Sequence, residues 1–279
     1  MILDCAGKPL DLSHPQVMGI LNVTPDSFSD GGQYAALDAA LIQAKKMVAD
    51  GAAIIDVGGE STRPGAAAVT IEEELSRVIP VIEAIHSEIN IPISIDTSKS
   101  DVMHAAINAG AGLINDVQAL RADGAIQIAA ELDVPVCLMH AQGTPQTMQN
   151  DPQYGDVVFD VTEFLLKRVA ACEQAGIARD KVILDPGFGF GKRAWHNLQL
   201  MKHLDKLVGQ GLPVLVGVSR KSMIGSLLKV SMEERLTASL ALASLAVWQG
   251  ASLIRSHDVC ETVQAITMCD HVMRVDDFD

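Results

Sequence analysis

Short apolar segments recur along the whole chain, and they constrain its fold more than any other feature. They are continuous runs, mostly of Val, Ile and Leu, without the polar alternation of strands that face water on one side. Such runs are typical of strands buried on both faces of a parallel sheet. Eight of them can be placed, at residues 16–21, 53–57, 93–95, 113–114, 134–139, 181–184, 214–218 and 252–254. We therefore expect a parallel sheet of eight strands.

Helical patterns with readable ends separate these segments. Thr70–Glu73 and Ser231–Glu234 have capping-box spacing, with Glu three residues after Thr or Ser, and predict helices that run to Glu88 and to Gly250. Other helices are expected to stop just before the next strand, at Gly51, Gly110 and Gly176. Eight βα units in 279 residues predict an α/β fold, a single-domain (β/α)8 TIM-type barrel over residues 1–279. A doubly wound sheet is the structural alternative.

Charge and cysteine content narrow the classes of function. The chain has 35 acidic and 21 basic side chains and a formal net charge of −14, which argues against a nucleic-acid partner because phosphate backbones are held mainly by Lys and Arg. A small anionic substrate stays compatible with this charge if a few basic residues gather in one place. The five cysteines show no CxxC spacing, and no signal peptide is visible in residues 1–10. We expect a cytoplasmic protein with reduced thiols and no zinc site.

One uncharged stretch, residues 236–254, is long enough to be tested as a membrane span. It contains several Ser, Thr and Gln residues, and Gly250 interrupts it. We therefore expect a buried helix followed by a strand, and no membrane partner.

Polar side chains follow almost every predicted strand. The clusters are Asn22–Thr24, Asp56–Glu60, Asp96–Ser98, Asn115–Asp116, His140, Asp185–Gly187, Ser219–Lys221 and Arg255–His257. In a barrel these clusters all meet at the C-terminal rim, where barrel enzymes place their chemistry. In a doubly wound sheet only those beside the switch point would meet. The clusters therefore favour both the barrel and an active site.

Asp96, Asn115 and Asp185 suggest recognition of a heterocycle. A carboxylate accepts two parallel N–H bonds, and an amide reads a mixed donor and acceptor edge. The alternative is that the carboxylates only cap the turns that follow their strands. A divalent-metal site formed by Asp96 and Asp185 is a further alternative, but no histidine stands at metal-ligand spacing to join them.

Basic residues near the predicted rim are candidates for binding an anion. Arg255 and His257 lie two residues apart just after the last strand, the usual phosphate position in such barrels. Asn22 and Arg63 on neighbouring loops would complete the positive site. The alternative for Arg255 is a rim ion pair, for example with Asp258.

Lys221 and the segment 185–192 add two more features. Lys221 follows the predicted strand 214–218, so its side chain starts at the mouth of the barrel. A lysine there can form a Schiff base, donate a hydrogen bond to an acceptor or hold an anion. The segment DPGFGFGK is rich in glycine but lacks the P-loop pattern. Its glycines let backbone approach a flat ligand, with Phe188 or Phe190 as an apolar wall.

Taken together, these segments resemble the dihydropteroate synthase family from end to end. The two strongest motifs are MGILNVTPDSFSDGG at 18–32 and GAAIIDVGGESTRPG at 51–65. Supporting motifs are IDTSK at 95–99, IND at 114–116, LDPGFGFGK at 184–192, SRKS at 219–222 and RSHDV at 255–259. Ser256 stands where we expect an apolar residue.

The resemblance implies a transferase of folate biosynthesis, the target of sulfonamides. It would condense (7,8-dihydropterin-6-yl)methyl diphosphate with 4-aminobenzoate to give 7,8-dihydropteroate and diphosphate. The family pattern implies three pockets and a magnesium ion as cofactor, held by Asn22. The pterin site is Asp96, Asn115, Asp185 and Lys221; the diphosphate site is Asn22, Arg63, Arg255 and His257; the aminobenzoate site is Phe28, Thr62, Pro64, Phe190 and Ser219; the catalytic residues are Lys221, Arg255 and His257.

The leaving group suggests an SN1-like path, because an electron-rich dihydropterin delocalises positive charge at its methylene carbon. Two alternatives stay open from the sequence. One is a pterin-binding methyltetrahydrofolate methyltransferase of the same fold, which would not need the motifs at 22–30 and 62–64. The other is a non-catalytic pterin-binding subunit, which would not need Lys221, Arg255 and His257. Apolar residues on more than one face of the predicted helix 232–249 suggest a homodimer.

Overall fold

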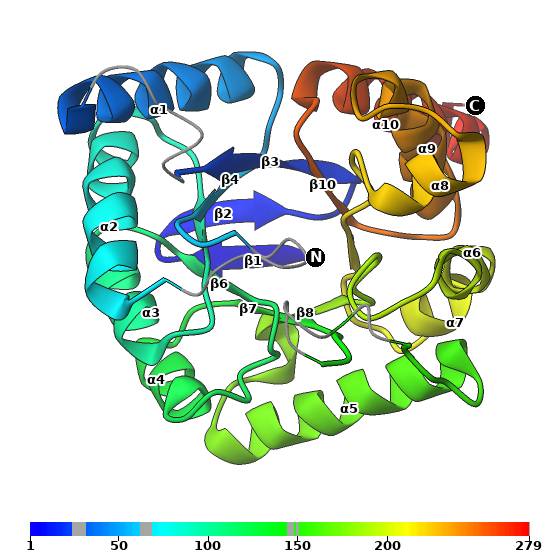
Figure 1. Cartoon of the computed structure of the whole chain (residues 1–279), viewed down its shortest axis with the longest axis horizontal. Helices are drawn as coiled ribbons and strands as arrows, with labels where there is room; N and C mark the ends of the chain where they lie inside the picture. The colour runs from blue at the N-terminus through cyan, green and yellow to red at the C-terminus, as the bar shows by residue number, and fades with distance from the viewer. Residues whose placement is uncertain (24–31, 62–68, 144–147, 149–150, 279) are drawn as a thin grey trace.

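The protein is a closed barrel of parallel strands surrounded by helices (Figure 1). The computed structural model describes residues 1–23, 32–61, 69–143, 148 and 151–278. Its eight-stranded sheet has the order β8-β7-β6-β5-β4-β3-β10-β9, so the strands follow one another in chain order around the barrel. A parallel bridge between Leu184 and Val214 closes the ring between β8 and β9. The predicted (β/α)8 barrel is confirmed, and the doubly wound alternative is wrong.

The strands lie where the apolar segments predicted them. Their bounds are β3 Gln16–Asn22, β4 Ile54–Gly58, β5 Ile93–Asp96, β6 Leu113–Asp116, β7 Val136–Met139, β8 Val182–Asp185, β9 Leu215–Val216 and β10 Leu253–Ser256. The helices are α1 Gly32–Ala49, α2 Ile71–Glu88, α3 Ser100–Asn108, α4 Ala125–Leu132, α5 Val157–Ala175, α6 Ala194–Lys202, α7 Asp205–Val208, α8 Ser222–Leu228, α9 Leu236–Trp248 and α10 Val259–Met273. Short 3-10 turns occur at η2 Arg179–Lys181, η3 Glu233–Arg235 and η4 Val275–Phe278.

Alternation along each strand divides the barrel core in two. Outward side chains such as Ile55, Ile114 and Val136 pack against the helices in one large apolar cluster. Inward side chains form a second, smaller cluster at the N-terminal end of the barrel, which contains Met18, Ile54, Leu113, Cys137, Ile183, Leu215 and Leu253. The next inward positions toward the C-terminal end are largely polar. The barrel is therefore packed with aliphatic side chains at its floor and is polar at its mouth.

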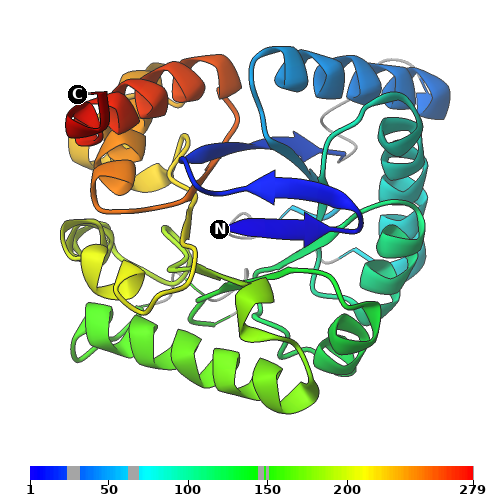
Figure 2. The same cartoon turned by 180° about the vertical axis from the view of Figure 1, so that it is seen from behind.

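A β-hairpin that the sequence did not predict closes the floor. Strands β1 Ile2–Cys5 and β2 Lys8–Asp11 pair antiparallel and lie across the N-terminal end of the barrel (Figure 2). Leu3, Cys5 and Leu10 are buried in the floor cluster. The hairpin thus covers apolar side chains that would otherwise meet water at the open end.

Helix ends agree with the sequence at one capping box and differ at the other. Thr70 caps α2 by accepting a hydrogen bond from the Glu73 N–H at 3.2 Å. At Ser231 only the return contact forms, from the Ser231 N–H to Glu234 at 2.9 Å. The chain continues as the 3-10 turn η3, so α9 begins at Leu236 and not at residue 232.

Residues 236–254 form a helix and then a strand, as expected, but α9 is only partly buried: Ala243, Ala246 and Val247 are in the core, whereas Leu245 and Trp248 are exposed. In the part of the chain that the structure describes, the helices fall short of the length and apolar character needed to cross a bilayer.

Candidate active site

Strand register brings the first three candidate residues together at the mouth of the barrel. Asn22 is the register partner of Gly58, Gly58 that of Asp96, and Asp96 that of Asn115. A Cβ built on Gly58 would lie 3.8 Å from Asn22 Oδ1 and 3.7 Å from Asp96 Oδ2. Glycine therefore leaves a small space between an amide oxygen and a carboxylate oxygen, and any larger residue would fill it.

Arg255 reaches across this mouth and binds two carboxylates. Its Nε donates to Asp56 Oδ2 at 2.6 Å, and its Nη2 donates to Asp96 Oδ2 at 2.8 Å. Burial lowers the pKa of the guanidinium, but Asp56 and Asp96 outweigh this effect and hold it above the ordinary value. The suggested rim pair of Arg255 with Asp258 is not the one that forms, because Asp258 binds Arg220.

Asp56 is the main site residue that sequence reasoning missed. It is fully buried, accepts from Arg255 and from Asn115 Nδ2 at 3.1 Å, and has one oxygen without a hydrogen-bond partner among the described residues. The strand-end pattern included Asp56 but gave no reason to choose it. Its inward position beside Ser94, its register partner on the next strand, is a product of the sheet.

Asp185 combines the two roles that the sequence left open. Its Oδ1 accepts from the Gly187 N–H at 2.7 Å and so caps its own turn. Its Oδ2 has no hydrogen-bond partner among the described residues. Burial raises the pKa of this carboxyl, and the hydrogen bond from Gly187 and the charge of Lys221 oppose that rise. One oxygen is thus structural and the other is available to a ligand.

Asp96 is strongly perturbed in the same direction. Burial raises its pKa to about 7, even though Arg255 lowers it. Asp116, which follows Asn115, is different in role: it faces away and accepts from the N–H groups of Gln118 and Leu120 at 2.8 and 2.7 Å. Of the two adjacent polar residues, only Asn115 belongs to the mouth.

Lys221 and Phe190 form one side of the pocket. Lys221 Nζ lies 4.2 Å from the centre of the Phe190 ring, a cation–π contact. Burial lowers the pKa of Lys221 to about 8, although Asp185 raises it. Phe188 is buried in the core at 1% exposure, whereas Phe190 is partly exposed. Phe190 is therefore the apolar wall that the sequence left undecided.

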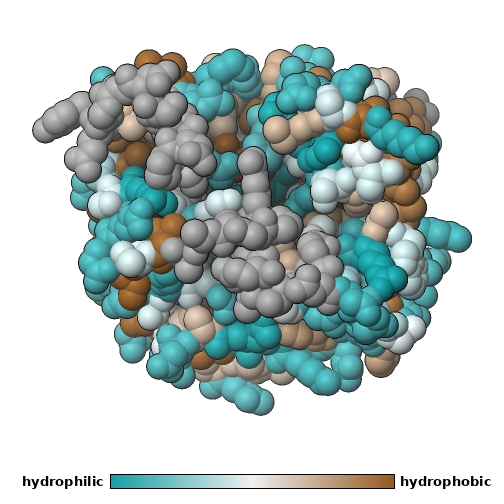
Figure 3. Space-filling view, in the orientation of Figure 1, coloured by the Kyte–Doolittle hydropathy of each residue, from teal (hydrophilic) through white to brown (hydrophobic). Residues whose placement is uncertain are grey.

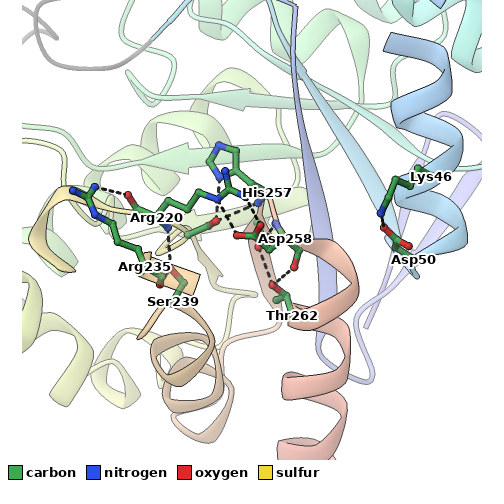
Figure 4. A network of polar contacts seen from close by, with 10 residues as sticks. Lys46, Asp50, Arg220, Arg235, Ser239, His257, Asp258 and Thr262 are labelled. Atoms are coloured by element: carbon green, nitrogen blue, oxygen red, sulfur yellow. Dashed lines mark hydrogen bonds and ion pairs between the residues drawn. The ribbon is translucent and has the colours of Figure 1, made fainter. Parts of the chain in front are cut away.

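His257 is held by Ser219 from the preceding strand end. The His257 N–H donates to Ser219 Oγ at 3.2 Å, and that oxygen lies 3.0 Å from His257 Nδ1. These two contacts fix the imidazole at the rim, where it projects from the loop between β10 and α10 (Figure 4). Ser219, which was predicted to line the aminobenzoate pocket, thus contacts His257, which was predicted to bind the diphosphate.

Lys192 is a second residue that the sequence reading missed. Its buried ammonium lies 2.9 Å from His140 Nδ1, and it donates to the backbone oxygens of His140, Gly187 and Phe190 at 3.1, 2.9 and 3.0 Å. Burial lowers the pKa of Lys192 to about 7 and that of His140 to about 2. His140 is therefore a neutral structural residue, and Lys192 shapes the loop that carries Phe190.

Ion pairs anchor the described ends of the segment between β4 and α2. Glu60 accepts from the Val69 N–H at 3.3 Å and pairs with Lys99, which also binds the buried Glu74. Four predicted site residues, Phe28, Thr62, Arg63 and Pro64, lie outside the described residues.

The oxygen atoms around Asn22 are suitable ligands for a hard cation. The amide of Asn22 makes no hydrogen bond to the described residues, and its oxygen faces the space beside Gly58 and Asp96. Amide and carboxylate oxygens are ligands that Mg²⁺ accepts, together with waters and substrate phosphate. Within the described residues no group of three His, Cys, Asp or Glu side chains stands ready to hold a metal by itself. A magnesium ion here would need ligands from a bound phosphate.

The described mouth therefore combines a set of hydrogen-bond acceptors, a lysine against an aromatic ring, and a rim histidine. Figure 3 shows this face of the molecule, where hydrophilic side chains are prominent around the described rim. Such a site can bind a flat, donor-rich ring in its depth and an anion at its edge.

Known proteins share this architecture. Residues 18–257 match the model of the family described as pterin binding enzyme. The dihydropteroate synthase of Escherichia coli strain K12 is 56% identical over 97% of this chain and 96% of its own length. That of Haemophilus influenzae is 52% identical over 94% of this chain and 95% of its own length.

Solved structures give the same result. The dihydropteroate synthase of Xanthomonas albilineans with 4-aminobenzoic acid superposes with a TM-score of 0.92 at 51% identity, covering 98% of both chains. The Yersinia pestis enzyme in complex with a sulfonamide drug gives 0.93 at 52% identity, covering 98% of this chain and 99% of that one. The Xanthomonas albilineans enzyme with 7,8-dihydropteroate gives 0.90 at 48% identity, with the same coverage.

These relatives match nearly the whole chain and favour the synthase over the methyltransferase alternative. The chain therefore belongs to the pterin-binding enzymes and, within them, to the dihydropteroate synthase family.

Proposed function

We propose that the mouth of the barrel divides the dihydropteroate synthase reaction among a pterin pocket, a diphosphate pocket and an amine pocket. The chain is a transferase that joins (7,8-dihydropterin-6-yl)methyl diphosphate to 4-aminobenzoate, as its family membership indicates. Solved relatives carry 4-aminobenzoic acid and 7,8-dihydropteroate.

The pterin pocket is formed by Asp96, Asn115, Asp185 and Lys221. A pterin presents its N3–H and its 2-amino group side by side, and the Oδ2 of Asp185 is an acceptor that the protein leaves unused. Lys221, whose charge acts on this carboxylate, supplies a donor, and Asn115 is fixed by its bond to Asp56. Because these groups are already buried and oriented, little reorganisation is needed when the ring enters.

The diphosphate pocket is formed by His257 and Arg255, with Asn22 and Arg63. His257 is fixed by Ser219, whereas Arg255 binds Asp56 and Asp96. Asn22 would hold Mg²⁺, which when bound offsets the negative charge of the departing diphosphate. Arg255 would reach the diphosphate only by sharing its guanidinium with the two carboxylates.

The aminobenzoate pocket is formed by Phe190, Ser219 and the stem of Lys221, together with Phe28, Thr62 and Pro64. The Phe190 ring and the methylene chain of Lys221 offer an apolar slot of the kind that an aromatic ring fills. Sulfonamide binding at this pocket is proposed because the Yersinia pestis relative was solved with such a drug.

Chemistry at this site needs positioning and charge stabilisation more than a base. Bond cleavage leaves positive charge on the dihydropterin methylene and negative charge on the diphosphate, in an SN1-like path. The carboxylates of Asp96 and Asp185 stabilise the cationic ring, while His257 and Arg255 stabilise the leaving anion. The arylamine is unprotonated at neutral pH, so it attacks without a general base.

We also propose a cytoplasmic homodimer formed through α9 and α10. These two helices pack on each other and leave large apolar side chains exposed, among them Leu245, Trp248, Met268 and Val272 at 50–64% exposure. Brown atoms gather on the side that carries α8 to α10 (Figure 3). Apolar side chains gathered on one face are typical of subunit contacts. All five cysteines are free, which fits a reducing compartment.

The convergence of Asp185, Asn115 and Lys221 on one polar mouth carries this proposal. The test is to incubate the purified protein with the pterin diphosphate and 4-aminobenzoate and to measure 7,8-dihydropteroate and diphosphate. We expect both products in equal amounts, with Mg²⁺ required. Omission of 4-aminobenzoate should abolish product, and a failure to form dihydropteroate with both substrates present would contradict the proposal.

A further inference from the structure

Arg220 lies between the site residues Ser219 and Lys221, in the loop between β9 and α8, and its backbone φ angle is positive. Arg220 has φ of 55°, a left-handed conformation that is strained for a residue other than glycine. This turn lets its neighbours, Ser219 and Lys221, contact His257 and Phe190 while Arg220 itself extends to Asp258. The conformation therefore needs other contacts to hold it.

Side chains from the start of α9 hold the backbone of Arg220. Its N–H donates to Ser239 Oγ at 2.9 Å, and Ser239 Oγ donates to the Arg235 carbonyl at 2.9 Å. Arg235 Nη1 returns a hydrogen bond to the Arg220 carbonyl at 3.1 Å. Both backbone polar groups of Arg220 are thus fixed (Figure 4).

A similar closed set of hydrogen bonds holds the backbone of Asp258, the residue after His257. Its N–H donates to Ser256 Oγ at 3.1 Å, Ser256 Oγ lies 2.8 Å from Thr262 Oγ1, and Thr262 Oγ1 donates to the Asp258 carbonyl at 2.6 Å. The hydroxyl of Ser256, at a position where an apolar residue was expected, therefore has a defined role.

The two anchored residues are joined by a two-pronged ion pair. Arg220 Nε donates to Asp258 Oδ2 at 3.0 Å, and Arg220 Nη2 pairs with Oδ1 of the same carboxylate. Asp258 occupies the N-cap position of α10, yet its side chain makes no cap hydrogen bond. The Asp258 carboxylate instead binds Arg220 in the loop between β9 and α8.

We propose that Arg220 and Asp258 are positioning residues that keep Lys221 and His257 at a fixed separation. This inference rests on the proposed function, in which Lys221 contacts the pterin and His257 the departing diphosphate. The side chain of Arg220 is 44% exposed and that of Asp258 is 13% exposed, and two contacts to the same carboxylate join the two loops. The contribution of this pair is geometric, because a shift of about 1 Å between catalytic groups costs about 100-fold in rate.

The test compares Arg220→Met, Arg220→Lys, Asp258→Asn and the double variant Arg220→Met/Asp258→Asn with the parent enzyme. Lys46→Met, which breaks the exposed Lys46–Asp50 pair also drawn in Figure 4, is the matched control. We measure kcat, the affinity for bare hydroxymethyl pterin and the melting temperature.

We expect kcat to fall roughly 10- to 100-fold in Arg220→Met and in Asp258→Asn. Arg220→Lys should recover part of the loss, and the double variant should be no worse than the poorer single one. Affinity for the bare pterin should change less than about threefold, and Lys46→Met should match the parent.

Unchanged kcat in Arg220→Met would overturn the inference, as would losses that add in the double variant. Losses that only follow a fall in melting temperature would also overturn it. An inactive parent enzyme would instead contradict the proposed function, so the two failures are distinguishable.

Discussion

Arg255 Nη2 donates to Asp96 Oδ2 at 2.8 Å, which joins the last strand of the barrel to β5 across the two strands between them. Each residue alters the other: Arg255 lowers the pKa of Asp96 against the effect of burial, and Asp96 raises the pKa of Arg255. The proposed diphosphate and pterin pockets therefore share a charge pair.

Replacing Asp185 with Asn should weaken pterin binding without unfolding the site. The amide retains an oxygen for the Gly187 N–H but can place its NH2 against the pterin donors. Such a mismatch costs about 2–4 kcal/mol in a buried site. Calorimetry with hydroxymethyl pterin measures the loss, and an affinity within about twofold of the parent would remove Asp185 from the pocket.

His257→Ala should weaken the pterin diphosphate far more than bare hydroxymethyl pterin, because only the former has the anion. Arg255→Ala should weaken both ligands, since it also leaves Asp56 and Asp96 without their partner. The measurement is the affinity of each variant for the pterin diphosphate and for bare hydroxymethyl pterin. Equal losses for both ligands in His257→Ala would show that His257 does not contact the diphosphate.

Pterin affinity should depend on pH with two limbs. Binding uses ionised Asp96, whose pKa is raised to about 7, so affinity should rise as pH increases toward that value. It also uses protonated Lys221, whose pKa is lowered to about 8, so affinity should fall above that value.

Titrations between about pH 5.5 and pH 9.5 test these limbs. Asp96→Asn should remove the contribution of Asp96 to the acid limb and leave that of Asp185, whose pKa burial also raises, and Lys221→Met should remove the contribution of Lys221 to the alkaline limb. Arg255→Met should move the acid limb to higher pH, because Arg255 lowers the pKa of Asp96. A flat profile in the parent protein would contradict the prediction.

Leu10→Ala should destabilise the protein without touching the site. Leu10 is 1% exposed in the floor cluster, and truncation of such a side chain costs about 2–4 kcal/mol. Urea unfolding measures the loss, while pterin affinity at low denaturant should equal that of the parent. An affinity loss that persists in fully folded protein would show that the hairpin shapes the mouth.

Local sequence patterns were enough to predict the strands and the residues that end them. Continuous apolar runs report burial on both faces, which is a local property, so all eight barrel strands were predicted close to their observed bounds. Asp96, Asn115 and Asp185 could be chosen because polar groups directly after such runs must reach the rim. The hairpin was missed because its four-residue strands gain their burial only from the floor they cover.

Which polar residues contact one another depends on how the barrel folds. Asp56 joins the mouth through inter-strand register, Lys192 is buried by a loop that folds around it, and Arg220 finds Asp258 38 residues further along the chain. Sequence patterns report periodicity over a few neighbouring residues, whereas these contacts depend on how distant strands and loops are placed. The main residues of the candidate site could therefore be predicted from the sequence. The charge pairs among them and the contacts that hold the rim loops depend on the folded barrel.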